Sequence, residues 1–217
     1  MNITEPELLR LVARGENSRA EFKKDVPDDE TLAEILCAFA NTRGGWLVIG
    51  VDEDLSATGC ANPKDVMSRV RLVAEEDLKP ALNIAQSSVR TEAGFLIAVH
   101  VNHSMERPHS IPCANRKRDI MVRVGLTNEV GDGATLNALR SHRTQEQPKD
   151  KLEIRILDWL GQREREGIEP AGSASAEIFS QATNVGLRRA SKALISLEAG
   201  GLIMGYGGRS HRQYALP

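Results

Sequence analysis

The apolar positions in the first part of the chain follow two different periods, which predict a helix and then a buried strand. Between residues 30 and 42 they recur at the i, i+3, i+4, i+7 spacing of one helix face. Residues 46–51 form an unbroken apolar run instead, which is typical of a strand buried on both faces. Gly44 and Gly45 separate the two patterns and predict that the helix ends there. The apolar residues of the helix face are Leu32, Ile35, Leu36 and Phe39.

The same patterns predict further helices and strands on both sides of this pair. Helices are expected over 5–14, 63–76 and 134–143, and strands over 19–25, 83–91, 95–101 and 119–124. Residues 103–117 read as a long basic loop that is broken by prolines. This order of elements predicts an α+β domain with a mixed sheet over residues 1–145.

A second domain is expected after a polar stretch that contains Pro148. We interpret residues 146–150 as a linker. Over residues 151–217 the pattern predicts three helices and then two short strands around a run of glycines. The helices span 151–165, 175–182 and 185–199, and the strands span 202–206 and 212–216. This is the order of elements in a winged helix-turn-helix domain.

The composition limits the classes of protein that fit. Of the 217 residues 41% are apolar, so a core can form, and a net charge of −2 shows no overall basic excess. Any surface for nucleic acid must therefore be local. The three cysteines lack metal-type spacing, and no segment looks like an export signal or a membrane span. We expect a cytoplasmic protein with no membrane partner, and the sequence leaves open whether it forms a homo-oligomer.

Acidic residues follow or flank two strands that are expected to be neighbours. Glu16 and Glu21 lie five residues apart at the first strand, and Asp52, Glu53 and Asp54 follow the apolar run. Because consecutive strands often pair, three or more carboxylates could converge on one groove. Such a cluster suits magnesium or manganese, which prefer oxygen ligands. Alternatively these acids form surface ion pairs with nearby cations, namely Lys23, Lys24 and Arg43.

The acids, the glycine pair and the apolar run, in this order, resemble the Schlafen-type Alba-like domain, once described as a divergent AAA domain. The resemblance covers about residues 10–143 and implies a mixed-sheet fold that handles nucleic acid. The residues that carry it are Glu16, Glu21, Phe22 and Lys23 of a Glu-x4-Glu-Phe-Lys motif, Gly44-Gly45, Gly50-Val51, and Arg123, Gly125 and Thr127.

The resemblance leaves two functions open, nuclease and DNA-binding protein, and the acids have a role in the first. In the nucleases of the family they form a metal-dependent ribonuclease site, which would here comprise Glu16, Glu21 and one of Asp52, Glu53 or Asp54. The nuclease pattern has two aspartates after Gly-Val and the second is catalytic, whereas here Asp52 is followed by Glu53. Many prokaryotic relatives are described only as DNA-binding proteins or transcriptional regulators.

Cations that could contact phosphates gather in both domains. The alternatives are a solvated loop in the first domain and a winged helix used for protein contacts in the second. The candidate residues are Lys23, Arg116, Lys117 and Arg118 in the first domain, Arg188, Arg189 and Lys192 on the helix over 185–199, and Arg209 and Arg212 on the wing.

These features favour a DNA-binding transcriptional regulator that needs no cofactor. The alternative is an endoribonuclease that uses magnesium or manganese and acts on structured RNA such as tRNA. An ATPase is not expected, because the chain has no G-x4-G-K-[ST] phosphate loop. The expected partner is DNA, with RNA as the second candidate.

Overall fold

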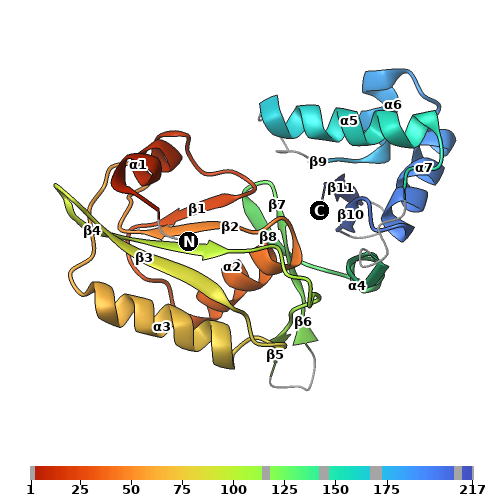
Figure 1. Ribbon diagram of the computed structural model, residues 1–217. Coiled ribbons are helices and arrows are strands. Elements are labelled where there is room, and N and C mark those ends of the chain that lie inside the picture. Colours follow the sequence, from red (N-terminus) through yellow and green to blue (C-terminus); the bar gives the residue numbers. More distant parts are fainter. Residues whose placement is uncertain (1–2, 114–117, 142–146, 167–172, 208–211, 217) are drawn as a thin grey trace. The chain divides into compact units, whose positions relative to one another are not determined.

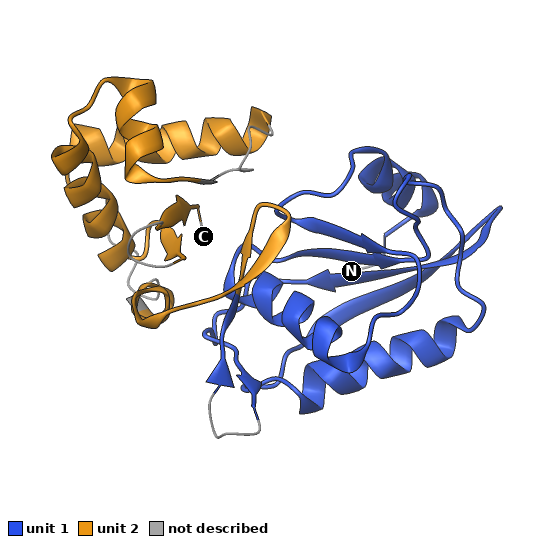
Figure 2. Ribbon diagram, turned by 180° about the vertical axis from the view of Figure 1, so that it is seen from behind, with its two compact units in different colours: residues 1–121 blue, residues 122–217 orange. Residues whose placement is uncertain are grey.

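A computed structural model describes residues 3–113, 118–141, 147–166, 173–207 and 212–216. Its contacts divide the chain into two compact units, residues 1–121 and residues 122–217 (Figure 2). The α+β class with a mixed sheet is confirmed.

The first unit is built on a four-stranded sheet in the order β1-β2-β4-β3. Strand β1 (Ala20–Lys23) runs parallel to β2 (Gly45–Ile49), whereas β3 (Ile84–Thr91) and β4 (Gly94–Val101) form an antiparallel hairpin that joins β2. Parallel neighbours need a crossover, and helix α2 (Asp29–Asn41) supplies it. The helix begins where Asp28 accepts a hydrogen bond from the Thr31 N–H at 2.8 Å.

Helices cover both faces of this sheet (Figure 1). On one face α2 and α3 (Pro63–Glu76) pack over Leu47 and Ile49, and on the other α1 (Glu5–Ala13) packs near Val48. The apolar run of β2 is therefore buried from both sides, as its sequence predicts. Four residues expected in the core are at most 1% exposed: Phe39, Leu47, Ile49 and Val51.

The corner between α2 and β2 requires both of its glycines. Gly44 has a φ of +70°, and a Cβ there would lie 2.5 Å from the carbonyl oxygen of Val101. A Cβ on Gly45 would lie 2.5 Å from the ring of Phe39 and 2.8 Å from the carbonyl oxygen of Arg19. Backbone and core therefore leave no space for a side chain at either position.

Asn41, the last residue of α2, is fully buried and holds a distant segment against the helix. Its Nδ2 donates to the carbonyl oxygens of His109 and Met121 at 2.9 and 2.8 Å, and its Oδ1 accepts from the His109 N–H at 2.7 Å. The segment between them includes the short strands β5 (Ile111–Pro112), which lies in the stretch expected to be a loop, and β6 (Arg118–Asp119).

The second unit combines helices with two small sheets. The predicted order of three helices and two strands is present, and an additional strand, β9, precedes the second of these helices and pairs with the last strand. The elements are β7 (Met121–Val124), β8 (Thr127–Val130), α4 (Gly133–Ser141), α5 (Lys151–Glu166), β9 (Ser173–Ala174), α6 (Ala176–Thr183), α7 (Leu187–Ala199), β10 (Met204–Tyr206) and β11 (Gln213–Ala215).

Helix α4 packs within the second unit, although the sequence assigns it to a first domain that ends at residue 145. It contacts α7 and β10, and its residues Ala138 and Leu139 are at most 1% exposed. The Thr135 hydroxyl donates to the Gly205 carbonyl oxygen at 2.5 Å. The division into domains at 146–150 stays a prediction, and the compact units divide earlier in the chain.

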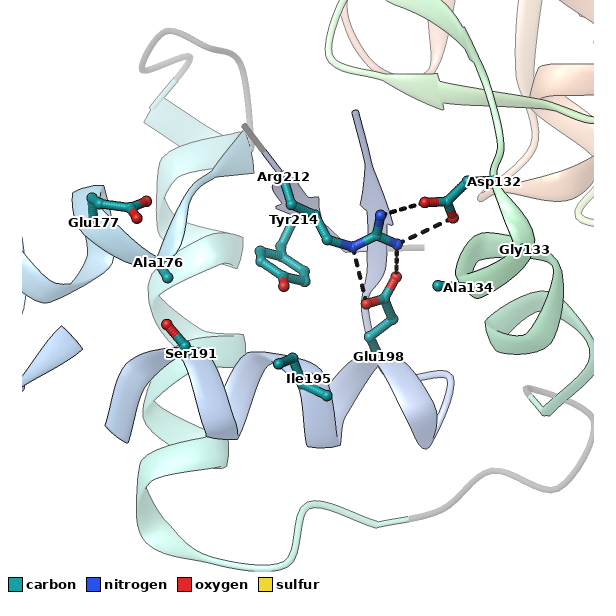
Figure 3. A pocket seen from close by; sticks show the side chains of 10 residues that line it. All are labelled: Asp132, Gly133, Ala134, Ala176, Glu177, Ser191, Ile195, Glu198, Arg212 and Tyr214. Carbon is teal, nitrogen blue, oxygen red and sulfur yellow. Dashed lines mark hydrogen bonds and ion pairs between the residues drawn. The ribbon is translucent and has the colours of Figure 1, made fainter. Parts of the chain in front are cut away.

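An arginine between two carboxylates joins three elements of the second unit (Figure 3). Arg212 forms an ion pair with Asp132 at 2.5 Å and another with Glu198 of α7. Asp132 Oδ1 also accepts a hydrogen bond from the Thr135 N–H at 2.9 Å, and so caps α4. Burial acts to raise the pKa of Asp132, but the hydrogen bonds from Arg212 and Thr135 outweigh it and lower the pKa to about 2.

Replacing Asn41 by leucine should strongly destabilise the protein. The substitution leaves the carbonyl oxygens of His109 and Met121 and the N–H of His109 buried without these partners. We expect the free energy of unfolding to fall by about 2–5 kcal/mol, measured by urea denaturation. The matched control is Asn137→Leu at an exposed position of α4, which should change it by less than about 0.5 kcal/mol. Equal effects of the two substitutions would contradict the role given to Asn41.

The contribution of the Asp132 charge to stability should disappear in acid. The pKa of this group in the folded chain is below its ordinary value of 3.8, so its stabilising effect is complete above about pH 4 and is lost as pH falls towards 2. Asp132→Asn keeps a residue that can cap α4 and removes the charge. The difference in Tm between wild type and variant should therefore shrink between pH 4 and pH 2. A difference that stays constant over this range would show that the charge does not matter.

Candidate nucleic-acid interface

A cavity of about 460 Å³ lies where β1 and β2 end, and part of the acidic cluster lines it. The residues that line it include three acids, Glu16, Asp52 and Glu53, and two lysines, Lys23 and Lys24. The sequence predicts that these two strand ends are adjacent, and the parallel pairing of β1 with β2 places them so. The cavity therefore carries both signs of charge.

A tight turn after β2 fixes the position of the acids at 52–54. Gly50 has a φ of +103° and its carbonyl oxygen accepts hydrogen bonds from the N–H groups of Thr58 and Gly59. Within the turn, Asp52 Oδ1 accepts from the Glu53 N–H at 2.9 Å, and Asp54 Oδ1 accepts from the Ser56 N–H at 2.9 Å. Side chains of this type commonly stabilise turns in this way.

Two of the three carboxylates at the cavity, those of Glu16 and Asp52, have partners within the chain. Glu16 Oε1 accepts a hydrogen bond from the Phe22 N–H at 2.7 Å. Asp52 Oδ2 pairs with Lys24 Nζ at 2.6 Å. The hydrogen bond between them lowers the pKa of Asp52 and raises that of Lys24. This pair corresponds to the surface ion pairs that the sequence offers as an alternative to a metal site.

Glu21 does not line the cavity, so the expected convergence of the acids is only partial. The residue is 7% exposed and its Oε1 lies 2.9 Å from Lys23 Nζ. Successive side chains of a strand point to opposite faces, and it is the neighbouring Phe22 that lines the cavity. Among the residues that the structure describes, no group of three or more acidic, histidine or cysteine side chains is suited to hold a metal. The side chains in this arrangement do not fit a bound magnesium or manganese ion.

In the second unit, three of the predicted cations share the exposed side of α7. Arg188, Arg189 and Lys192 are all exposed. The opposite side of the helix is buried in the core of the unit through Ala190, Leu194 and Leu197. The core thus fixes the rotation of α7. A turn in which Asn184 adopts a φ of +54° connects it to α6.

The remaining predicted cations differ in their surroundings. Arg118 is exposed on β6, and Lys23 is paired with Glu21. Arg212, predicted on the wing, has its guanidinium between Asp132 and Glu198, which leaves it less able to contact a phosphate than the cations of α7. Arg116, Lys117 and Arg209 lie outside the described residues.

Two acidic residues that matter here were not singled out from the sequence. Asp132 and Glu198 hold Arg212, and Asp132 precedes it by 80 residues. No local pattern signals a pairing over that separation.

In the part of the chain that the structure describes, no helix combines the length and the apolar character needed to cross a bilayer.

Two solved structures show a distant similarity to this chain. The chain is similar to the N-terminal domain of a RecG-related protein from Nitrosomonas europaea, with 22% identity and a TM-score of 0.44 over 52% of this chain and 82% of that one. It is also similar to the DIP2311 protein from Corynebacterium diphtheriae, with 14% identity and a TM-score of 0.41 over 73% of this chain and 39% of that one. Neither likeness is close enough to support an argument about function.

A search of curated proteins found no match. The model of a protein family described as Schlafen, AlbA_2 matches residues 16–130, which include both acidic segments, the glycine corner and the whole of the four-stranded sheet. This match covers more than half of the chain, and the chain therefore belongs to the Schlafen AlbA_2 family.

Proposed function

We propose that the protein is a DNA-binding transcriptional regulator and that α7 is the helix that contacts DNA. The observation that carries this proposal is the set of three exposed cations on α7 opposite its buried side. A helix that presents cations on its exposed side can neutralise phosphates, while neighbouring polar side chains reach base edges. No cofactor is needed for this function.

The order of elements around α7 supports the proposal. Helices α5, α6 and α7 are followed by the strands β10 and β11, and β9 completes a three-stranded sheet in the order β10-β11-β9. This is the order of a winged helix-turn-helix domain, in which the second helix of the turn enters the major groove. Arg212 joins β11 to α7 and so positions the strand beside the helix.

Family membership supports a function related to nucleic acid in a more general way. It does not distinguish a regulator from a ribonuclease. The assignment to DNA therefore remains part of the proposal. The same holds for the expectation of a cytoplasmic protein with no membrane partner. Structured RNA is the second candidate ligand.

The competing function is a metal-dependent endoribonuclease that uses the cavity at the ends of β1 and β2. The observation in its favour is that Glu16, Asp52 and Glu53 line one cavity. Against it, Glu21 lies outside the cavity and Asp52 is paired with Lys24. We therefore prefer the binding function, and a cleavage assay decides between the two.

Removing the three cations of α7 should weaken binding to duplex DNA. In fluorescence anisotropy titrations at two salt concentrations, we expect Arg188→Ala/Arg189→Ala/Lys192→Ala to lose affinity for every duplex tested. The salt slope should fall by about one for each cation that contacts a phosphate. Any of the three that reads a base should add a loss of about 1–3 kcal/mol on its preferred sequence.

The control for this experiment removes the same charge from other exposed positions of the second unit. Arg140→Ala/Lys151→Ala/Arg165→Ala removes three exposed cations from α4 and α5. It should leave the affinity and the salt slope close to those of the wild type. Unchanged affinity in the α7 variant, with its circular dichroism spectrum intact, would assign α7 to protein contacts instead.

Incubation with labelled tRNA and duplex DNA should give binding without cleavage. We expect EDTA to leave the complexes unchanged, because the binding function uses no metal. Manganese-dependent cleavage that disappears in Asp52→Asn would instead establish the ribonuclease. The matched control is Asp54→Asn, because Asp54 bonds to Ser56 in the same turn and does not line the cavity.

A further inference from the structure

An aromatic pair lies on the face of the first unit's sheet that α1 covers in part. Trp46 of β2 and His100 of β4 are cross-strand partners. Their ring centroids are 4.4 Å apart and the rings are tilted by 42°. Trp46 packs against the same apolar cluster as Val48 and Leu96, yet it remains partly exposed. The sequence gives no reason for an aromatic residue that is not fully buried in an otherwise aliphatic strand.

The exposed part of Trp46 lines a cavity of about 240 Å³ together with residues of α1. Arg10 and Arg14 line the same cavity and are both exposed. Among the described residues that line it, Glu7 is the one acid, and its Oε2 accepts hydrogen bonds from the N–H and the hydroxyl of Thr4 at 2.9 and 2.6 Å. The cavity therefore combines an aromatic ring with an excess of positive charge.

A third cation lies close to this pair. The backbone N–H of Trp46 donates a hydrogen bond to the backbone carbonyl oxygen of Arg19 at 2.9 Å. The Arg19 side chain is exposed. Burial lowers the pKa of His100, and the positive charge of Arg19 lowers it further. Since both effects favour the neutral imidazole, His100 can support Trp46 without adding a charge that would repel the arginines.

We propose that Trp46 is a stacking site for a base of single-stranded nucleic acid, with Arg10, Arg14 and Arg19 placed to contact the adjacent phosphates. Aromatic rings beside cations are the usual elements of such sites, because every base presents a π-face and every nucleotide a negative charge. A base inside a duplex has both faces covered by its neighbours, so the site selects unpaired nucleotides. A purely structural tryptophan would need no flanking cations.

This site is separate from the proposed DNA contact through α7 and does not depend on it. Every residue that forms it belongs to the first unit, whereas the cations of α7 belong to the second. A protein with both sites could hold duplex DNA with one unit and an unpaired strand with the other. The two proposals can therefore fail independently.

Tryptophan fluorescence of the full chain gives a direct test. The chain has two tryptophans, so Trp159→Phe leaves Trp46 as the single tryptophan, which can be excited selectively at wavelengths where tyrosine does not absorb. Trp159 packs against Phe179 in the second unit, and phenylalanine conserves an aromatic ring there. In this background, a single-stranded oligo-dT of 15 nucleotides should quench the fluorescence of Trp46. An abasic strand of the same length, which keeps the phosphates, should not.

Variants separate the aromatic and the electrostatic contributions. Trp46→Leu should weaken binding of oligo-dT about tenfold or more, and Trp46→Phe should weaken it less. Arg10→Gln/Arg14→Gln leaves Trp46 in place and should reduce the affinity and the salt slope. Its control is Lys64→Gln/Arg71→Gln, which removes two exposed cations from α3 on the other side of the sheet.

The outcomes are decisive in both directions. Quenching by oligo-dT that persists in the α7 triple variant, while its affinity for duplex is lost, would support two independent sites. Equal quenching by the abasic strand or by a polyglutamate peptide would overturn the proposal in favour of a general anion or an acidic protein segment. Unchanged affinity of both Trp46→Leu and Arg10→Gln/Arg14→Gln for oligo-dT would also overturn it.

Discussion

The amide of Asn41 joins the end of α2 to segments that follow 68 and 80 residues later in the chain. It is fully buried, so each of its hydrogen bonds replaces one to water, and a lost partner would leave a buried polar group unsatisfied. The same region receives a second tie, because the buried guanidinium of Arg107 donates to the Asn41 carbonyl oxygen at 3.3 Å. Together these bonds hold the segments around His109 and Met121 against the end of α2.

The end of α2 in turn determines where the strands begin. Gly44 and Gly45 reverse the chain three and four residues after that end, and neither position has space for a Cβ. β2 can therefore start directly beside β1, which brings the turn at 52–54 next to the end of β1 and forms the acidic cavity. The chemistry available at that cavity is thus a consequence of a corner that contains no functional group.

The sequence predicts what depends on local period, and fails where distant residues meet. The buried run of β2 follows from periodicity alone, and so does the buried face of α7 except for Leu187, which was expected to be buried and is 44% exposed. The motif spacing of Glu16 and Glu21 suggests that their carboxylates converge. The alternation of side chains along β1 instead places Glu21 and Phe22 on opposite faces, and it is Phe22 that lines the cavity. The engagement of Arg212 by Asp132 has no local signal, because tertiary packing brings the two together.

Strand β8 was missed for a related reason. Three of its four residues, Thr127–Val130, are polar, and all four are partly or fully exposed, so they show no alternation that a sequence pattern would detect. The strand pairs with β7, whose four residues are buried, so the apolar signal of this hairpin lies in β7.

The packing of α4 has a practical consequence for anyone who divides this chain. The sequence predicts a linker at the polar stretch that contains Pro148. A cut there would separate Ala138 and Leu139 of α4 from α7 and β10. It would also remove Asp132 from Arg212, which would keep its ion pair with Glu198. A C-terminal fragment intended to fold independently should therefore begin before Asp132, so that it carries its own helix cap and its own counterion.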